Sequence, residues 1–194
     1  MAIARQNNSD NLHYSGDLPK GWLRCRVSEA FEINPKVVGN DEEECAFVPM
    51  ALVPDGYSSE LRFERKRWGT IKKGFTHFAD GDIGVAKISP CLENRKSVVF
   101  RGLPSGIGAG TTELIIFRPI FVTAEYGLLF FKSQEFISSC KRTYNGVVGQ
   151  QRVDLSEVRR MYINIPPFLE QHKIAQAVEL LFRQLESIQR SNDL

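Results

Sequence analysis

The sequence has little of what marks a disulfide-rich scaffold or a zinc-binding protein. Its four cysteines, Cys25, Cys45, Cys91 and Cys140, lie far apart, and no two of them form a Cys-x-x-Cys pair. Structural zinc sites and small disulfide scaffolds both need closely and regularly spaced cysteines. We therefore expect no metal site and no disulfide framework, and we interpret the cysteines as buried free thiols.

Long apolar segments are also missing. The most apolar run, residues 114–131, is interrupted by charged residues and a proline, so it is unsuited to cross a bilayer. Residues 1–17 are polar and lack the apolar core of a signal peptide. At 194 residues, of which 42% are hydrophobic, the chain is long enough for one domain with a real core. These features predict a cytoplasmic protein without membrane contact.

The net charge is low as well, at +2, but the charges are unevenly placed. Residues 1–60 contain twice as many acidic as basic residues, whereas residues 61–101 contain ten Lys or Arg against four Asp or Glu. Aromatic residues accompany the cations of the second segment, as expected of a surface that neutralises phosphates. An ordinary solvated face explains the pattern equally well. The candidate phosphate-binding residues there are Arg65, Lys66, Arg67, Lys72 and Lys73.

A polar loop is predicted at residues 141–152, between a helix and the last strand. It contains three cations, one asparagine and two glutamines, and no acid. Asn and Gln can pair bidentately with adenine, Arg with guanine, and any of the cations with phosphate. By residue type alone, a structural connection is the better interpretation. The candidates for DNA contact in this loop are Lys141, Arg142, Asn145, Gln150, Gln151 and Arg152.

Residues 102–112 form a second predicted loop, in which four glycines would let a ligand approach the backbone closely. The loop connects two predicted strands and does not lead into a helix, so it lacks the setting of a nucleotide-binding loop. We interpret it as a flexible loop that lies next to DNA.

Short apolar or alternating runs bounded by Gly and Pro predict strands. They cover residues 46–53, 62–68, 82–88, 97–100 and 113–117. Apolar residues at helical spacing between Tyr126 and Cys140 predict one helix that packs on the sheet. The predicted fold class is α+β: a mixed, loop-rich sheet domain with packed helices, followed by a C-terminal helix of the coiled-coil type.

Pro166 and Pro167 mark a joint, because proline fits the first turn of a helix, where its missing N–H costs nothing. The residues that follow show the four-three-four-three apolar spacing of a coiled-coil seam. This spacing predicts a helix over 167–194 that needs a partner helix from another copy, from a second half of the protein or from a different subunit. The predicted helix-interface residues are Ile174, Val178, Leu181, Leu185 and Ile188.

Asp55, Glu64 and Lys66 imitate the arrangement of many metal-dependent nucleases, in which carboxylates hold Mg²⁺ and a lysine helps to activate water. The Pro-Asp-Gly before Tyr57 is also an ordinary turn, and Glu-x-Lys is frequent in charged strands. A small Mg²⁺-dependent nuclease therefore stays an alternative, as does an interaction module that uses its last helix and does not contact DNA. If the chain instead binds DNA without cleaving it, we expect no catalytic residue, cofactor or metal.

Six motifs occur along the chain in a characteristic order. They are Leu18-Pro19-Lys20-Gly21-Trp22; Gly81-Asp82-Ile83 with Ala86-Lys87-Ile88-Ser89-Pro90; Glu93-Asn94-Arg95-Lys96; Gly108-Ala109-Gly110-Thr111-Thr112-Glu113-Leu114; Gly146-Val147-Val148-Gly149-Gln150-Gln151-Arg152-Val153; and Pro166-Pro167-Phe168-Leu169-Glu170-Gln171 with Ile174. Together they resemble the motifs of specificity subunits of type I restriction-modification systems. Any one of them would be weak evidence, but their shared order makes the resemblance strong.

The resemblance implies a non-catalytic target-recognition domain for double-stranded DNA at residues 18–166. It also implies a flexible N-terminal segment at 1–17 and the start of a conserved spacer or dimerisation helix at 167–194. Arg95 and Lys96 join the candidate DNA contacts on this basis. The implied partners are methyltransferase subunits and, through them, restriction subunits. Because the family carries two recognition domains and this chain one, the chain is either a half-sized subunit that self-associates or a fragment of a longer subunit.

Overall fold

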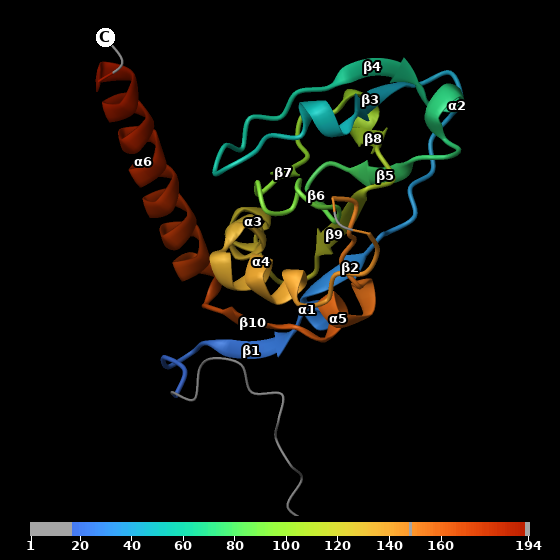
Figure 1. Cartoon of the computed structure of the whole chain (residues 1–194). Coiled ribbons are helices and arrows are strands. Elements are labelled where there is room, and N and C mark those ends of the chain that lie inside the picture. The colour runs from blue at the N-terminus through green and yellow to red at the C-terminus, as the bar shows by residue number, and fades with distance from the viewer. Residues whose placement is uncertain (1–16, 148, 193–194) are drawn as a thin grey trace, which may run out of the picture.

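The structure, a computed structural model, describes residues 17–147 and 149–192. Its centre consists of two four-stranded sheets (Figure 1). The first sheet has the order β2–β9–β6–β7, and all of its strand pairs are antiparallel. Its strands are β2 (Phe31–Ile33), β9 (Leu114–Pro119), β6 (Ile83–Ala86) and β7 (Ser97–Val99). All but Asp17 of the predicted N-terminal segment lies outside the described residues.

The second sheet has the order β4–β3–β8–β5, with β3 and β8 parallel and the other pairs antiparallel. Its strands are β4 (Glu64–Arg67), β3 (Glu44–Val48), β8 (Ile107–Gly110) and β5 (Thr76–Ala79). The prediction of a flexible loop at 102–112 is therefore wrong, because this segment supplies an inner strand. A Cβ on Gly108 would lie 2.3 Å from the ring of Phe78 and 2.7 Å from the carbonyl oxygen of Ala46. Gly108 and Gly110 let neighbouring groups pack closely on β8 and do not offer backbone to a ligand.

Two helices replace the single helix predicted between Tyr126 and Cys140. They are α3 (Ala124–Lys132) and α4 (Gln134–Lys141). Ser133 separates them because its backbone is extended and its hydroxyl accepts the N–H of Phe136, which caps α4. The apolar faces of both helices contribute to one buried cluster that also contains Phe31 of β2 and Phe117 of β9. The predicted packing of helix on sheet is thus confirmed. The cap at Ser133, which divides the predicted helix into two, was not revealed by the periodicity.

A two-stranded ribbon closes the domain opposite the second sheet (Figure 1). It pairs β1 (Leu23–Arg26) with β10 (Tyr162–Ile165) in antiparallel register. The remaining short elements are α1 (Val27–Ala30), α2 (Trp68–Ile71), α5 (Leu155–Arg160) and the 3₁₀ turns Met50–Leu52 and Pro104–Gly106. The five predicted strands correspond to β3, β4, β6, β7 and β9, although the first ends at Val48, before a 3₁₀ turn. The α+β prediction is confirmed.

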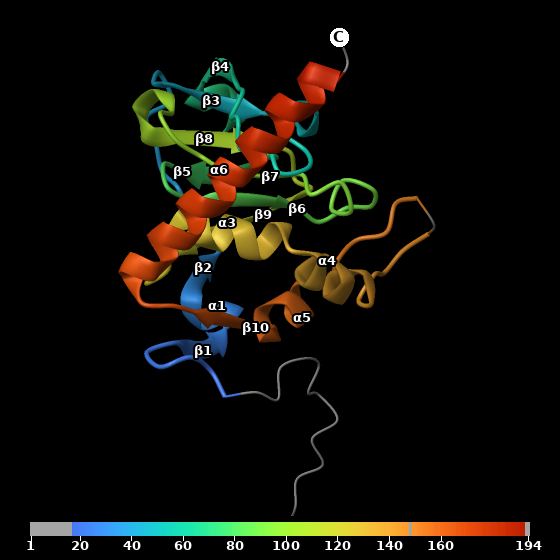
Figure 2. The same ribbon diagram turned by 90° about the vertical axis from the view of Figure 1, so that its left-hand side faces the viewer.

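The long helix α6 (Phe168–Asn192) starts directly after the two prolines and crosses over α3 (Figure 2). Gln171, which is 2% exposed, fixes its first turn. The Gln171 side-chain oxygen accepts the backbone N–H of Thr123 at 2.7 Å, and its amide nitrogen donates to the carbonyl of Pro166 at 3.0 Å. One amide thereby joins α6 to the start of α3 and to the end of β10.

Two sequence expectations concern burial and membranes. Cys25, Cys45 and Cys140 are buried and Cys91 is half-buried, all as free thiols, so burial is confirmed for three of the four. Burial raises the pKa of the Cys140 thiol to about 12, which leaves it in the unreactive protonated form at neutral pH. Within the described part of the chain, no helix is both long and apolar enough to cross a membrane.

Replacing Gln171 with Ala should lower the free energy of unfolding by about 1–3 kcal/mol, because it strands a buried donor and a buried acceptor. Urea titration followed by circular dichroism measures this change. Gln176→Ala, at an exposed position of the same helix, is the matched control and should change stability by less than about 0.5 kcal/mol. Equal midpoints for the two variants would refute the bridging role of Gln171.

Candidate nucleic-acid interface

The cationic segment, defined here as residues 62–73, folds against an acidic turn at residues 41–44. Arg65 forms an ion pair with Glu44, and Arg67 forms one with Glu42. The Nζ of Lys72 lies 2.6 Å from a carboxylate oxygen of Asp41. The pairing of β3 with β4 brings the acidic end of one strand beside the basic end of the other. Segments that look oppositely charged in sequence therefore largely neutralise each other in space.

The remaining cations and aromatics of this segment have mixed surroundings. Lys66 pairs with Glu64 at 3.1 Å and lies 3.8 Å from the ring centroid of Phe47. Lys73 is exposed and has no ion-pair partner among the described residues. Trp68 is only 3% exposed and belongs to the core, so it is not available to stack on a base. As a phosphate-binding surface, the segment retains one unpaired lysine and several cations that a phosphate would have to share with carboxylates.

The other predicted contacts gather at a second place, where the turn 88–96 lies against the polar loop 141–152. The Ser89 N–H donates to the Gln151 carbonyl at 2.9 Å, and Ile88 forms a β-bridge with Arg152. The Ser89 hydroxyl donates to Glu93 at 2.9 Å. Burial, followed by the nearby Glu93 carboxylate, raises the pKa of Tyr144 above its usual value. Backbone hydrogen bonding thus joins the two segments into one unit, although they are about 50 residues apart in the chain.

Within the polar loop, Arg152 is anchored and its neighbours are free. Its guanidinium binds the Glu113 carboxylate at 2.7–3.1 Å, and this hydrogen bond lowers the pKa of Glu113. The side chains of Lys141, Asn145 and Gln150 are exposed and make no hydrogen bond within the described residues. The backbones of Asn145 and Arg152 hydrogen-bond each other at 2.8 and 3.0 Å, which closes the loop. A closed loop with free amide and ammonium groups can present donors and acceptors to a base edge.

Arg95 and Lys96 point the other way, toward the protein. The Nζ of Lys96 donates to the carbonyl of Val53 at 2.7 Å. Arg95 donates to the carbonyl of Lys132 at 3.1 Å and to the side chain of Gln134 at 2.9 Å. Their prediction as DNA contacts stays a prediction, but both cations are already engaged by backbone or side-chain oxygens.

Residues 19–194 match the type I restriction modification DNA specificity domain. The chain belongs to this family. The resemblance seen in the six sequence motifs is confirmed.

Two curated relatives of the specificity domain come from Escherichia coli. This chain is 43% identical over 175 residues to the type I restriction enzyme EcoAI specificity subunit and 45% identical over 161 residues to the EcoEI specificity subunit. The alignments cover 89% and 81% of this chain, but only 29% and 27% of the relatives. The chain therefore spans less than a third of the length of these proteins.

Two solved structures share the fold of the specificity domain. The HsdS subunit from Thermoanaerobacter tengcongensis superposes with a TM-score of 0.70 at 16% identity, covering 91% of this chain and 46% of that one. The second is a chain from a structure described as the structural basis of complex assembly and conformational transition of the type I R-M system. It superposes with a TM-score of 0.66 at 16% identity, covering 93% of this chain and 43% of that one. At this identity the likeness establishes the fold alone.

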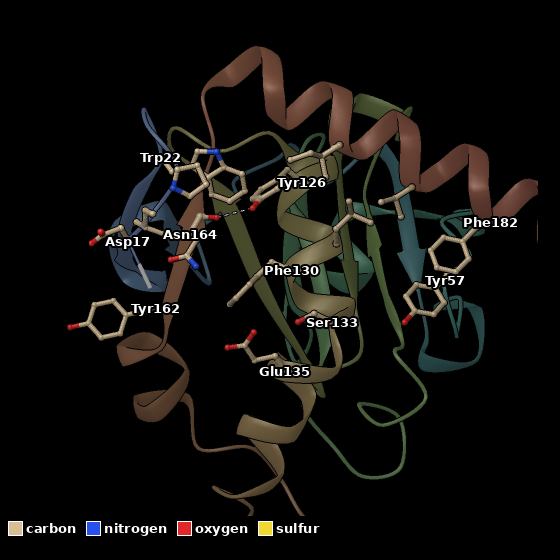
Figure 3. A pocket seen from close by; sticks show the side chains of 15 residues that line it. Asp17, Trp22, Tyr57, Tyr126, Phe130, Ser133, Glu135, Tyr162, Asn164 and Phe182 are labelled. Carbon is tan, nitrogen blue, oxygen red and sulfur yellow. Dashed lines mark hydrogen bonds between the residues drawn. The ribbon is translucent and has the colours of Figure 1, made fainter. Parts of the chain in front are cut away.

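A groove of about 740 Å³ lies between α3, α6 and the ribbon of the specificity domain (Figure 3). Most of its lining is apolar or aromatic, and its two charged lining residues, Asp17 and Glu135, are both acidic. Such walls disfavour phosphate, so the groove is no part of the candidate DNA surface. Ile174 and Val178 of the predicted seam line this groove and thus face their own domain. The other three seam residues, Leu181, Leu185 and Ile188, are more than half exposed.

The nuclease alternative gains no support from the specificity domain. Glu64 and Lys66 form an ion pair with each other on β4, and Asp55 lies in a separate loop. Among residues 17–147 and 149–192, no group of three His, Cys, Asp or Glu is placed to hold a metal ion. The family match favours recognition over cleavage.

Lys132 is the residue that sequence reasoning missed. It is 1% exposed, and its ammonium donates to the carbonyls of Gly56 at 2.9 Å and Arg95 at 3.1 Å. Burial lowers the pKa of Lys132 to about 8, an effect that nearby Asp55 opposes and Arg95 reinforces. A single cation at the end of the apolar run of α3 was the available signal.

Lys132 should make the stability of the domain depend on pH. Below pH 8 the folded and unfolded chains both hold the proton, so the burial cost is present in full. Between pH 8 and 10.5 the unfolded chain holds more protons than the folded one, so the free energy of unfolding rises with pH. Relative to Lys132→Met, the wild type should gain about 1–3 kcal/mol over this window.

Urea titrations at pH 7, 8, 9 and 10 measure this difference, with Lys173→Met at an exposed position of α6 as the control. The control should follow the wild type at every pH. A difference between wild type and Lys132→Met that stays constant from pH 7 to pH 10 would contradict the lowered pKa.

Proposed function

We propose that this chain reads a DNA sequence for a type I restriction-modification complex and performs no catalysis itself. The family match over residues 19–194 carries the proposal, supported by relatives that are specificity subunits of type I restriction enzymes. The fold provides a closed polar loop with exposed amides and cations, as sequence reading requires. In such a complex, methylation and cleavage fall to other subunits. The cell compartment that suits this role is the cytoplasm.

Base contacts are assigned to the polar loop. Asn145, Gln150 and Gln151 can pair with adenine, and Arg152, held in place by Glu113, presents its remaining edge to guanine. Lys141 and Arg142 at the start of the loop suit phosphates. In the cationic segment, Lys73 is the first candidate for phosphate contact. A phosphate would first have to displace the carboxylate partners of the other four candidates, Arg65, Lys66, Arg67 and Lys72.

Assembly is assigned to α6. We propose residues 18–166 as the recognition domain and 167–194 as the start of a spacer or dimerisation helix that also meets methyltransferase subunits and, through them, restriction subunits. The exposed residues Leu181, Leu185 and Ile188, together with Leu180, supply an apolar surface for a partner helix. The partner helix comes from a second copy, from the rest of a longer subunit or from a different subunit.

The deciding experiment is retention of a random double-stranded DNA library by the methyltransferase complex that contains this chain. Sequencing of the retained DNA should give a defined motif. In parallel, the chain alone, incubated with plasmid and Mg²⁺, should leave the plasmid intact. Absence of any enriched motif would refute sequence recognition, and plasmid cleavage would restore the nuclease alternative.

The double variant Gln150→Ala/Gln151→Ala should reduce discrimination between the enriched motif and a scrambled sequence by about 30-fold or more, since each of the two lost base contacts costs about 1–3 kcal/mol. Fluorescence anisotropy with both DNAs measures the ratio. Arg62→Ala, which removes only a surface ion pair with Glu60, is the control. If discrimination by the double variant equals that of the wild type, the polar loop does not read bases.

Lys72→Ala/Lys73→Ala should weaken binding to all DNA sequences alike. The slope of log affinity against log salt concentration should become shallower by the amount expected for the loss of about one to two phosphate contacts. Lys73→Ala should account for most of this effect, because Lys72 already shares its charge with Asp41. Affinities at several salt concentrations give the slopes. An unchanged slope in the double variant would remove the cationic segment from the DNA-binding surface.

A further inference from the structure

The backbone of Arg95 is in a conformation that its side-chain contacts explain. Its φ is 58°, a left-handed value that is costly for a residue with a Cβ and persists where surrounding contacts hold it. The guanidinium meets the carbonyl of Lys132 and the side chain of Gln134, and it lies 5.0 Å from the ring centroid of Tyr57. These contacts tie the end of the turn 88–96 to the junction of α3 and α4.

Lys132 holds the same place from the protein interior. Its ammonium binds the carbonyl of Arg95 and the carbonyl of Gly56, the residue before Tyr57. The N–H of Gly56 in turn donates to the carbonyl of Asn94 at 2.8 Å. The turn 88–96 and the loop that carries Tyr57 are therefore fastened to each other at several points.

Tyr57 connects the turn 88–96 and its own loop to α6. Its ring stacks on the ring of Phe182 with a centroid distance of 4.0 Å and an angle of 16° (Figure 3). Phe182 lies three turns beyond Gln171, on the far side of the groove from the ribbon (Figure 3). The helix is thus attached to the domain at its first turn and again at Phe182.

At its other end, the turn 88–96 supports the polar loop through the β-bridge between Ile88 and Arg152 and the hydrogen bond from the Ser89 N–H to the Gln151 carbonyl. Consecutive contacts therefore run from Phe182 through Tyr57 and Arg95 to the polar loop. If a partner on α6 displaces Phe182, Tyr57 loses its stacking surface and the turn beneath the polar loop loses one of its attachments.

We propose that Arg95 is a positioning residue that couples the placement of α6 to the conformation of the polar loop, and that it does not bind phosphate. The proposal rests on the proposed function, because the polar loop must be the part that reads DNA. In this proposal, the assembly of other subunits on α6 directly changes the affinity of the chain for its target sequence. Coupling of this kind requires that changes at either end of the connection act through the same structural state.

The first test measures binding of the enriched DNA motif by the methyltransferase complex containing Arg95→Gln, Phe182→Ala or both. Each single variant should weaken specific binding by about 5- to 20-fold with an unchanged salt slope, and the double variant should lose little more than either single one. Gln176→Ala, at an exposed position of the same helix outside the proposed interface, should bind as the wild type. Should Arg95→Gln fail to fold, Tyr57→Leu removes the same connection at a half-exposed side chain.

Three outcomes would overturn the proposal. A salt slope that falls by about 0.9 in Arg95→Gln would identify Arg95 as a phosphate contact. Losses that multiply in the double variant would show that the two residues act independently. Equal binding by Phe182→Ala and Gln176→Ala would show that α6 has no influence through this contact.

The second test needs neither DNA nor partners. Hydrogen exchange of the full chain should show that Phe182→Ala speeds exchange of the Asn145 and Arg152 amides, which close the polar loop, at least threefold over Gln176→Ala. Unchanged protection refutes the coupling even if Gln150→Ala/Gln151→Ala abolishes discrimination, which would leave the proposed function intact. Conversely, faster exchange combined with full discrimination by that double variant would refute the reading role of the loop and not the coupling.

Discussion

The placement of the long helix depends on one buried amide. Gln171 accepts a hydrogen bond from the N–H of Thr123 and donates one to the carbonyl of Pro166. Only a side chain with both a donor and an acceptor can satisfy these groups together, and a buried group left unsatisfied is costly. The two prolines limit where α6 can begin, and Gln171 fixes the direction in which it leaves. The groove beneath the helix and the stacking of Phe182 on Tyr57 both follow from that direction.

Long or well-marked elements could be predicted from the sequence, because their signals are local. The double proline, the seam spacing of α6 and the alternating strands each reflect the geometry of a single segment. The strands β1, β2, β5, β8 and β10 contain only three or four residues, too few for a period to emerge. The strands β4, β6 and β7 are equally short, but they lie in apolar or alternating runs that made them predictable. In β8 the glycines also concealed the strand, since what they permit is the close approach of Phe78 and Ala46, which no local pattern encodes.

The candidate site was predictable as a set of residue types and not as an arrangement. The polar loop was singled out by its composition, and it is exposed as a DNA-reading loop needs to be. The partners of the cations could not be foreseen, because Arg65, Arg67 and Lys72 meet acids more than 20 residues away through strand pairing. Arg95, Lys132 and Tyr57 likewise meet because two separate loops lie against the end of α3. Charge counted along a chain says which groups exist, and the fold decides which of them remain free.

The acidic turn at 41–44 has a consequence for how a DNA-reading domain searches a genome. Phosphates occur at every step of every duplex, so a surface of bare arginines would hold the protein on irrelevant DNA for long times. Here each arginine of β4 already has a carboxylate neighbour, and a phosphate must compete with it. In the proposed role, contact with arbitrary DNA would release fewer counterions, and residence there would be short. Among the described residues of the polar loop, the side chains of Lys141, Asn145 and Gln150 meet no such internal competitor, so the domain would dwell where the bases fit.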